Sequence, residues 1–330
     1  MSTSIAPDSI LRDLSQMWTS LGKQESGSVS ETGVLRACSL TLVVVAAPGE
    51  DSMALGETLA ALMPRHPSRA IVIRLEGSDA PSANVTAQCW MPFGQHRQIC
   101  CEQIELRAAE NGLDDLASIL GPIAAPDLPL ILWCRGKHAL DAPSFAHLAA
   151  QATRVVVDTG AWPDPKQAIR KLAEVARTVP VGDLSWTRLT RWREMLAQVF
   201  ENPQYASRIP EIRNIRVTCG GDQAPSQAYY MAAWTADALR RSGAKAEFAL
   251  VTDPDVQAGD LQTVELSDDG FNLTLTHLRE TLIATVNSLS RCIRLPAGTD
   301  HVLMNEELDI VRRDPVFERT LAAAVQLLPA

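Results

Sequence analysis

The chain has 330 residues, 46% of them hydrophobic and 21% charged, a composition typical of folded globular domains and not of disordered or fibrous chains. Its length predicts two domains, each large enough for a core of its own. Thirty basic and 39 acidic residues give a formal charge of −9, which disfavours nucleic acid and anionic membrane surfaces as partners.

The N-terminal sequence and the apolar runs indicate a cytoplasmic protein. The longest apolar run, residues 40–47, is far shorter than the roughly 20 residues that a membrane helix needs. Residues 1–13 lack the basic start and apolar stretch of a secretory signal. Most of the seven cysteines lie in strand-like runs, so we expect buried reduced thiols and not a disulfide framework.

Residues 1–35 are expected to form an amphipathic helix and a flexible linker. Apolar side chains recur on one helical face between residues 8 and 22, and Asp8 is a suitable N-cap. Residues 24–33 are rich in Ser, Gly and Glu without a hydrophobic period, which is typical of a tether. We expect the helix to dock on the chain's own body, with a partner as the alternative.

Residues 36–180 have the pattern of a Rossmann-like α/β domain. Four apolar runs separated by helical segments predict buried parallel strands: 39–47, 69–75, 128–134 and 154–158, with helices near 52–63 and 143–152. Two alternating segments, 83–91 and 97–106, flank a turn at 92–96 and predict an antiparallel hairpin. The sheet is therefore expected to be mixed.

Residues 181–205 are expected to form a connecting helix rich in Trp and Arg, followed by a second domain at 206–330. That domain begins with a strand at 212–219 and a helix at 224–241, and continues with several short strands before a helical C-terminus. This order predicts an α+β fold with a largely antiparallel sheet.

The turns of the chain lack a phosphate-binding motif. After the first apolar strand, residues 48–52 (PGEDS) contain one glycine and two acids, and neither GxGxxG nor a P-loop pattern occurs. Gly220 and Gly221, between a strand and a helix, form the best remaining candidate for an anion-binding turn, with a plain tight turn as the alternative. No cofactor is expected.

The predicted hairpin carries three candidate redox thiols, Cys89, Cys100 and Cys101. A turn centred on residues 94–95 places Cys89 opposite Cys100 and points Cys101 to the other face. We interpret the facing pair as packed thiols, with a redox-sensitive disulfide as an alternative. A zinc site that includes His96 lacks the usual ligand spacing, so no metal is expected.

The 183–200 segment contains the main candidates for a partner interface. At 3.6 residues per turn, Trp186 and Trp192 share the apolar half of a helix with Arg188 and Arg193, whereas Arg191 faces away. An arginine on an apolar face must be paired or lie at an interface. The arginines therefore pair with acids of the first domain, or this face binds a second protein or an anion.

His66 and Arg69 are further candidates for the interface. Their segment also fits a helix-to-strand connection in which Pro67 ends the helix and His66 or Arg69 contacts helix C-terminal carbonyls. The chain has no nucleophile elbow and no recognisable Ser-His-Asp pattern, so no catalytic residue is predicted.

Five segments occur in the order and spacing of a known family: 66–73 (HPSRAIVI), 98–106 (QICCEQIEL), 126–133 (PDLPLILW), 155–160 (VVVDTG) and 183–194 (DLSWTRLTRWRE). They resemble the glucose-6-phosphate dehydrogenase assembly proteins, also called OpcA proteins of the oxidative pentose phosphate cycle. The resemblance spans roughly residues 38–330. Where the family has Thr-Pro-Trp-Arg, this chain has Arg191 in place of the proline, so the helix is predicted to begin earlier, around Leu184.

The resemblance implies a two-domain, non-catalytic protein that binds glucose-6-phosphate dehydrogenase, promotes its active oligomer and raises its activity. In photosynthetic members of that family the thiols are linked to thioredoxin control. The alternative is an α/β enzyme or sensor that itself binds a sugar phosphate or a nucleotide.

Overall fold

The computed structural model describes residues 6–25, 34–76, 81–92, 94, 97–109 and 112–328, and the chain folds into two compact units. Unit 1 comprises Met1–Val157, Thr178–Pro180 and Met304–Arg312. Unit 2 comprises Asp158–Arg177, Val181–Leu303 and Arg313–Ala330. The sequence predicted an N-terminal domain at 36–180, a connecting helix at 181–205 and a second domain at 206–330. In the structure, residues 158–177 belong to unit 2 and residues 304–312 belong to unit 1.

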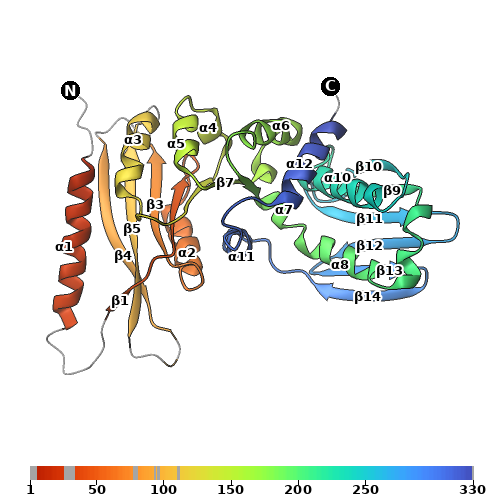
Figure 1. Cartoon of the computed structure of the whole chain (residues 1–330), viewed down its shortest axis with the longest axis horizontal. Helices are drawn as coiled ribbons and strands as arrows, with labels where there is room; N and C mark the ends of the chain where they lie inside the picture. The colour runs from red at the N-terminus through yellow and green to blue at the C-terminus, as the bar shows by residue number, and fades with distance from the viewer. Residues whose placement is uncertain are drawn as a thin grey trace. The chain divides into compact units, whose positions relative to one another are not determined.

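Unit 1 contains a mainly parallel sheet (Figure 1). Its parallel strands follow the order β5-β3-β2-β6-β7 and are β2 (Leu40–Val45), β3 (Ser68–Leu75), β5 (Gln98–Ala108), β6 (Leu130–Cys134) and β7 (Arg154–Val157). The short β1 (Val34–Arg36) pairs in parallel with the start of β5, and β4 (Ser82–Trp90) runs antiparallel along it. The predicted hairpin is therefore confirmed.

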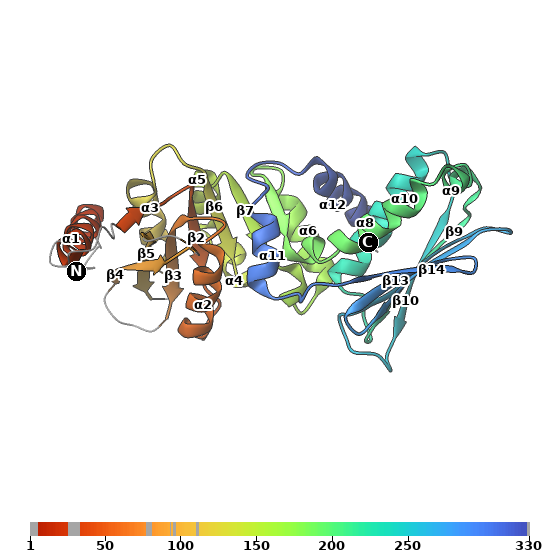
Figure 2. The same cartoon turned by 90° about the horizontal axis from the view of Figure 1, so that it is seen from below.

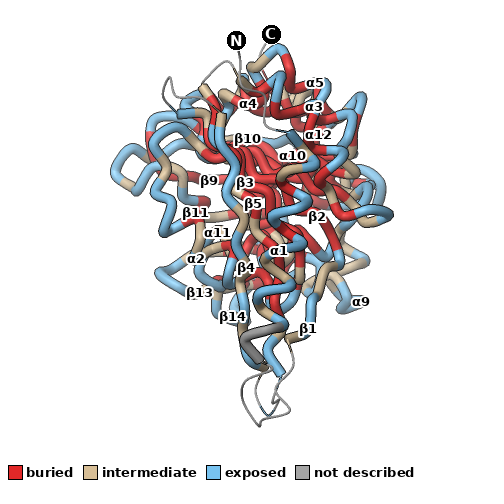
Figure 3. Tube along the Cα trace, turned by 90° about the vertical axis from the view of Figure 1, so that its left-hand side faces the viewer, coloured by how far each residue is buried: buried red, intermediate tan, exposed pale blue. Residues whose placement is uncertain are grey.

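Helices cover the sheet of unit 1, and this explains the continuous apolar runs of its central strands. They are α2 (Ser52–Leu62), α3 (Leu113–Ile123), α4 (Lys137–Asp141), α5 (Phe145–Gln151) and the end of α11 (Asp300–Glu307). Every residue of β2 and β6 is buried, whereas most of β4 is exposed or half-buried. Figure 3 shows this contrast, with exposed colour along β4 and buried colour along β2.

The N-terminal helix α1 (Pro7–Glu25) docks on unit 1 itself, against β4 and α3. Ile10 and Leu14 are buried in this contact. Trp18 Nε1 donates a hydrogen bond of 2.6 Å to Glu102, a buried carboxylate that also pairs with Arg36. Residues 26–33 of the predicted linker lie outside the described residues.

Unit 2 contains a second sheet, with strand order β10-β9-β11-β12-β13-β14. The strands are β9 (Asn214–Gly220), β10 (Glu247–Asp253), β11 (Leu261–Ser267), β12 (Asn272–Leu278), β13 (Thr281–Val286) and β14 (Leu289–Arg294). β9 and β10 are parallel, and the other neighbouring pairs are antiparallel. The predicted fold class, α/β with a second, largely antiparallel α+β domain, is confirmed.

The remaining elements of unit 2 are largely helical: η1 (Thr159–Ala161), α6 (Pro165–Val175), the short strand β8 (Val181–Asp183), α7 (Leu184–Thr187), α8 (Thr190–Phe200), α9 (Pro203–Ala206), η2 (Ile209–Glu211), α10 (Ser226–Arg241) and α12 (Pro315–Leu327). α10 packs on β9 and β10, and α12 packs against α10 and α6. A helix does begin at Leu184, as predicted, but it is not continuous. Leu189 N–H bonds to Trp186 O, three residues back, and the chain turns before α8 begins.

A buried ion pair joins the segment 304–312 to the sheet of unit 1. Arg154 at the start of β7 pairs with Glu307 of α11, and its guanidinium also donates to Ile310 O at 2.5 Å. Both side chains are almost fully buried. This pair explains why a segment distant in sequence belongs to the first unit.

We predict that Glu307→Gln lowers the free energy of unfolding by about 3 kcal/mol, because it leaves the buried Arg154 charge without its counter-charge. Urea denaturation measures the loss. The control is Glu194→Gln, which breaks an exposed pair with Arg191 and is expected to cost less than about 1 kcal/mol. Equal losses in the two variants would contradict the importance of the buried pair.

Candidate functional site

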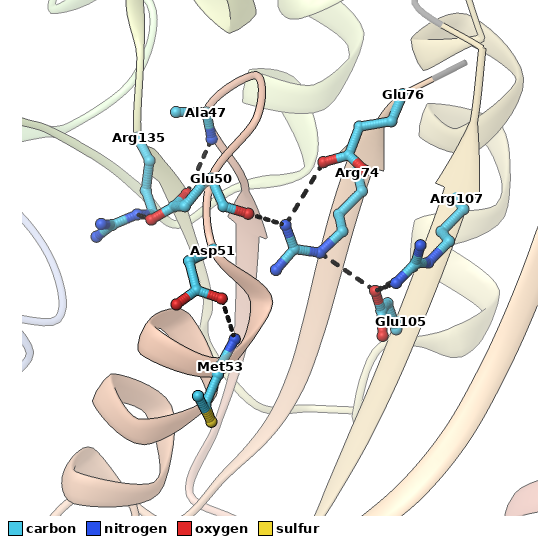
Figure 4. A network of polar contacts seen from close by, with 9 residues as sticks. All are labelled: Ala47, Glu50, Asp51, Met53, Arg74, Glu76, Glu105, Arg107 and Arg135. Atoms are coloured by element: carbon cyan, nitrogen blue, oxygen red, sulfur yellow. Dashed lines mark hydrogen bonds and ion pairs between the residues drawn. The ribbon is translucent and has the colours of Figure 1, made fainter.

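Charged side chains gather at the carboxyl ends of β2 and β6 (Figure 4). In doubly wound sheets, ligands bind at the carboxyl edge where the strand order reverses, which here lies between these two strands. Glu50, in the turn after β2, pairs with Arg135, which follows β6. The same carboxylate accepts the Ala47 N–H at 3.0 Å. The chain's own side chains therefore bridge the position where this type of fold binds its ligand.

Arg74 on β3 extends this network toward β5. Its side chain is only 2% exposed and donates to the Glu50 carbonyl at 2.9 Å. It also pairs with Glu105 at 3.2 Å and Glu76 at 3.6 Å, and Arg107 pairs with Glu105 at 2.8 Å. Figure 4 shows these guanidinium groups alternating with carboxylates, so the charges balance within the network.

The start of α2 is unsuited to phosphate. Asp51 caps the helix by accepting the Met53 N–H at 3.0 Å, and Glu50 already uses the N–H of Ala47. A phosphate here would displace these bonds and meet two carboxylates, whereas phosphate-binding turns offer free N–H groups and glycine. Arg135 is held further by its stacking over Trp133, with the guanidinium carbon 4.5 Å from the ring centroid.

A second polar cluster surrounds Asp183 in unit 2. This carboxylate is 0% exposed. One oxygen accepts the backbone N–H groups of Thr159 and Ser185 at 3.1 and 2.9 Å. The other accepts the hydroxyl groups of Thr159 and Tyr230 at 2.5 and 2.7 Å. Asp183 therefore links η1, the start of α7 and the second turn of α10.

Asp158 lies beside this cluster and forms a two-bond ion pair with Arg188, at 2.8 and 2.7 Å. The Ser185 hydroxyl and the Gly160 N–H also donate to Asp158, each at 3.1 Å. A Cβ on Gly160 would lie 2.9 Å from Ser185 Oγ, so the close approach requires glycine. Two of the family-like segments, 155–160 and 183–194, thus meet in one cluster.

Burial controls the protonation of the cluster. It raises the pKa of Asp183 to about 6, and the negative charge of Asp158 acts in the same direction. The hydrogen bonds from Thr159 and Tyr230 oppose this rise. Burial and the nearby Asp183 also raise the pKa of Tyr230. Burial alone would lower the pKa of Arg188, but its bonds to Asp158 outweigh that effect and raise it.

The two tryptophans predicted at a partner interface belong instead to the core of unit 2. Trp186 is 2% exposed and Trp192 is 4% exposed. Trp186 stacks on Phe317 at a centroid distance of 5.6 Å, and the Arg193 guanidinium lies over the Trp186 ring, 3.6 Å from its centroid. Neither indole is available to a partner in this structure, because the unit's own elements bury the apolar side of this segment.

The arginines of this segment have different environments. Arg188 pairs with Asp158, which lies in the range predicted for the first domain but in observed unit 2. Arg193 donates to Thr190 Oγ1 at 3.1 Å. Arg191 is 44% exposed and pairs with Glu194 at 2.7 Å. Of these three, Arg191 remains the candidate with an accessible charge.

His66 and Arg69 have structural environments inside unit 1. Both residues are buried. His66 Nε2 lies 3.0 Å from Asn305 O. Arg69 donates to Glu102 at 2.5 Å and to Ile123 O, at the end of α3, at 2.7 Å. Arg69 therefore contacts a helix C-terminal carbonyl, but it is that of α3 and not that of α2, the helix that precedes Pro67. Because both side chains are buried, neither residue presents a surface for a partner.

The turn at Gly220 and Gly221 is a tight turn and not an anion site. The two N–H groups already donate to Asp260 O and Asp253 O, each at 2.8 Å. A Cβ on Gly220 would lie 2.0 Å from Gln257 O, and Gly221 has a φ of 94°. The backbone at residues 253–260 therefore occupies the position where the predicted turn would bind an anion.

Cys89 and Cys100 form a disulfide across β4 and β5, so the interpretation as packed thiols is wrong for this pair. The predicted register does place them opposite each other, with Cα atoms 4.1 Å apart. Cys101 is a free, buried thiol whose pKa is raised to about 11 by burial. The described residues contain no cluster of three or more potential metal ligands, and His96 lies outside them.

Sequence reasoning did not single out Glu50, Arg135 or Tyr230 as parts of a site. The two acids after the first strand were a usable signal for Glu50, because that turn normally carries glycines. Arg135 directly follows a buried strand, and such positions lie at the carboxyl edge of the sheet. Tyr230 carries no such signal, since its helix position only predicts burial.

The chain matches, in succession, both domains of the family described as "Glucose-6-phosphate dehydrogenase subunit". Residues 60–174 match its N-terminal domain, and residues 179–321 match its C-terminal domain. A protein of Synechocystis sp. named "Putative OxPP cycle protein OpcA" is 27% identical over 198 residues, and one of the same name from Nostoc punctiforme is 30% identical over 182 residues. These alignments cover 58% and 53% of this chain but only 41% and 38% of the relatives' own lengths.

Among solved structures, an oxidoreductase from Sinorhizobium meliloti aligns with 88% of this chain and 96% of its own, at 9% identity and a TM-score of 0.49. In the described part of the chain, no helix combines the length and apolar character that crossing a membrane requires.

We predict that removing the disulfide by Cys89→Ala with Cys100→Ala lowers the free energy of unfolding by about 2 to 3 kcal/mol, since the bond restricts the unfolded chain. It closes a loop with a sequence separation of 11. Urea denaturation of oxidised protein measures the change. The control Cys292→Ala removes an exposed free thiol and is expected to leave stability unchanged. If reductant destabilised the double variant as much as the wild type, another bond would be responsible.

We predict that Asp183→Asn flattens the pH dependence of stability between about pH 4 and pH 6. With a raised pKa, folded Asp183 binds its proton more tightly than the unfolded chain, so this residue favours folding at low pH and loses that contribution as pH rises through about 6. The loss is roughly 3 kcal/mol. Urea unfolding at several pH values measures it. Asp222→Asn, at an exposed position, should retain the wild-type profile.

Proposed function

Because the chain belongs to the OpcA family of glucose-6-phosphate dehydrogenase assembly proteins, we propose that it binds a glucose-6-phosphate dehydrogenase and favours the active assembly of that enzyme. In this proposal the chain performs no catalysis itself and acts as an allosteric effector in the oxidative pentose phosphate pathway. The two family matches together span residues of both units.

The ion pair between Glu50 and Arg135 is the observation that carries the proposal. It occupies the edge of the first sheet where a dehydrogenase of this fold class would hold its dinucleotide. The carboxylate takes the N–H group that a phosphate would use. This arrangement favours an effector over the alternative, a nucleotide-binding or sugar-phosphate-binding enzyme.

The proposed effect requires differential affinity. An effector shifts its partner between two states only if it binds one state more tightly than the other. A difference of about 1 to 3 kcal/mol corresponds to a 5-fold to 150-fold effect, which an ordinary protein interface supplies.

We place the contact on the exposed side of α8. Arg191 and Glu194 lie there at the surface, while Trp186 and Arg188 hold the same segment rigidly against unit 2. A charged group on a rigid helix loses little conformational freedom on binding, which favours its use in recognition.

We predict that adding this chain to purified dehydrogenase from the same organism raises the enzyme's activity and shifts its sedimentation to a larger species. Arg191→Glu is expected to raise the half-maximal concentration of the chain by about tenfold, because it reverses an accessible charge at the proposed contact. The matched control is Arg12→Glu on the exposed side of α1, which should leave the half-maximal concentration unchanged.

Two outcomes would count against this function. In the first, the dehydrogenase has the same activity and sedimentation with and without the chain. In the second, the chain alone reduces NADP⁺ with glucose 6-phosphate. If Arg191→Glu and Arg12→Glu behaved alike while stimulation persisted, the function would stand and the contact would lie elsewhere.

A further inference from the structure

Helices cover one face of the sheet in unit 2, and no described element of the same unit packs on the other face. α10 and α8 pack on the covered face, where alternate strand residues such as Val217, Leu266 and Leu275 are fully buried. Figure 2 shows the strands of this unit with helices on one side, and no described element of unit 2 drawn over the opposite side. We call the side chains that point there the open face.

The open face contains two complete rows of side chains that cross all six strands in register. The first row is Val251, Thr218, Thr263, Thr276, Ile283 and Cys292. The second row is Ala249, Arg216, Glu265, Thr274, Thr285 and Ser290. The first row is uncharged, and the second carries one positive and one negative side chain, which lie 3.7 Å apart.

The composition makes these two rows complementary to themselves. A hydroxyl group both donates and accepts hydrogen bonds, so a row of threonines can bond with an identical row. Arg216 and Glu265 on one copy can pair with Glu265 and Arg216 on another. The neutral first row also allows two chains of formal charge −9 to approach without concentrating like charges at the contact.

The size of the open face suits a stable dimer. Six strands spaced about 4.8 Å apart and some six or seven residues long, at about 3.3 Å per residue, cover roughly 600 Å². A standard interface buries about 800 Å² of accessible surface on each partner. The open face with its rim therefore supplies the area that such an interface needs, and two sheets pack well face to face.

We propose that the open face is a homodimer interface, on which the same face of a second copy of this chain packs around a two-fold axis. Such an isologous contact closes on itself, which is the commonest symmetry of soluble oligomers. Thr276 and Ile283 lie near its middle, and Cys292 lies on the edge strand. The proposal concerns the chain alone and does not depend on the dehydrogenase.

Sedimentation velocity of the purified full chain between about 1 and 50 µM tests the proposal. We expect a reversible dimer, and we expect Thr276→Lys to raise its dissociation constant by about 100-fold, because two buried lysines would face each other. The matched control is Thr86→Lys, the same change at an exposed position of β4 in unit 1, which should leave the dimer intact. Thermal unfolding of both variants checks that they are folded.

A second readout uses the wild-type protein without a variant. Cys292 is an exposed free thiol in the single chain, so its alkylation by a maleimide, followed by peptide mass spectrometry, should slow as the protein concentration rises. A wild type that sediments as a monomer at the highest concentration, or a Thr276→Lys dimer as tight as the wild type, would overturn the proposal. If wild type is monomeric and Thr276→Lys alone loses stimulation of the dehydrogenase, the open face binds the dehydrogenase and not a second copy.

Discussion

The carboxylate of Glu50 determines what the first sheet offers at its carboxyl edge. It accepts the Ala47 N–H, pairs with Arg135 across the reversal of strand order, and lies beside the Asp51 cap of α2. An edge built with free N–H groups and glycine would attract phosphate, whereas this one already holds a negative charge and its counter-charge. A doubly wound sheet can therefore lack a phosphate-binding turn, as the sequence of this chain does, because the same backbone arrangement can carry different side chains at this edge.

The other charged clusters also pair each buried charge with a counter-charge, since a buried charge is costly unless a partner and hydrogen bonds replace its water. Arg154 pairs with Glu307 in unit 1, and Arg188 pairs with Asp158 in unit 2.

The sequence predicted those parts of the fold that depend on local pattern. Continuous apolar runs at β2 and β6 indicate strands buried on both faces, and the alternation around Cys89 and Cys100 even predicted the correct register of the hairpin. The sequence did not predict contacts between residues that lie far apart in the chain. Nothing in the local pattern indicates that Glu307 returns to Arg154, or that residues 158–177 belong with unit 2.

The Trp and Arg segment shows the same limit at the candidate site. Helical periodicity placed Trp186, Trp192, Arg188 and Arg193 on one side, and that grouping is compatible with a core as well as with an interface. The choice depends on what packs there, namely Phe317 of α12 and Asp158 beside η1. Neither Phe317 nor Asp158 belongs to the Trp and Arg segment itself, and Asp158 lies 30 residues from Arg188 in the chain. A sequence shows which side chains are charged or aromatic, but only the folded structure shows which residues they contact.

The two proposed surfaces support one another in function. α8 and the open face belong to the same unit, and α8 packs on the covered side of the sheet whose other side forms the open face. A dimer built through the open face would therefore present two copies of α8 with a fixed geometry. A ligand with two matching sites binds such a dimer with a high effective concentration for the second contact, whereas a ligand with one site does not. If both proposals hold, bivalent presentation would supply the differential affinity that favouring an enzyme's oligomer over its monomer requires.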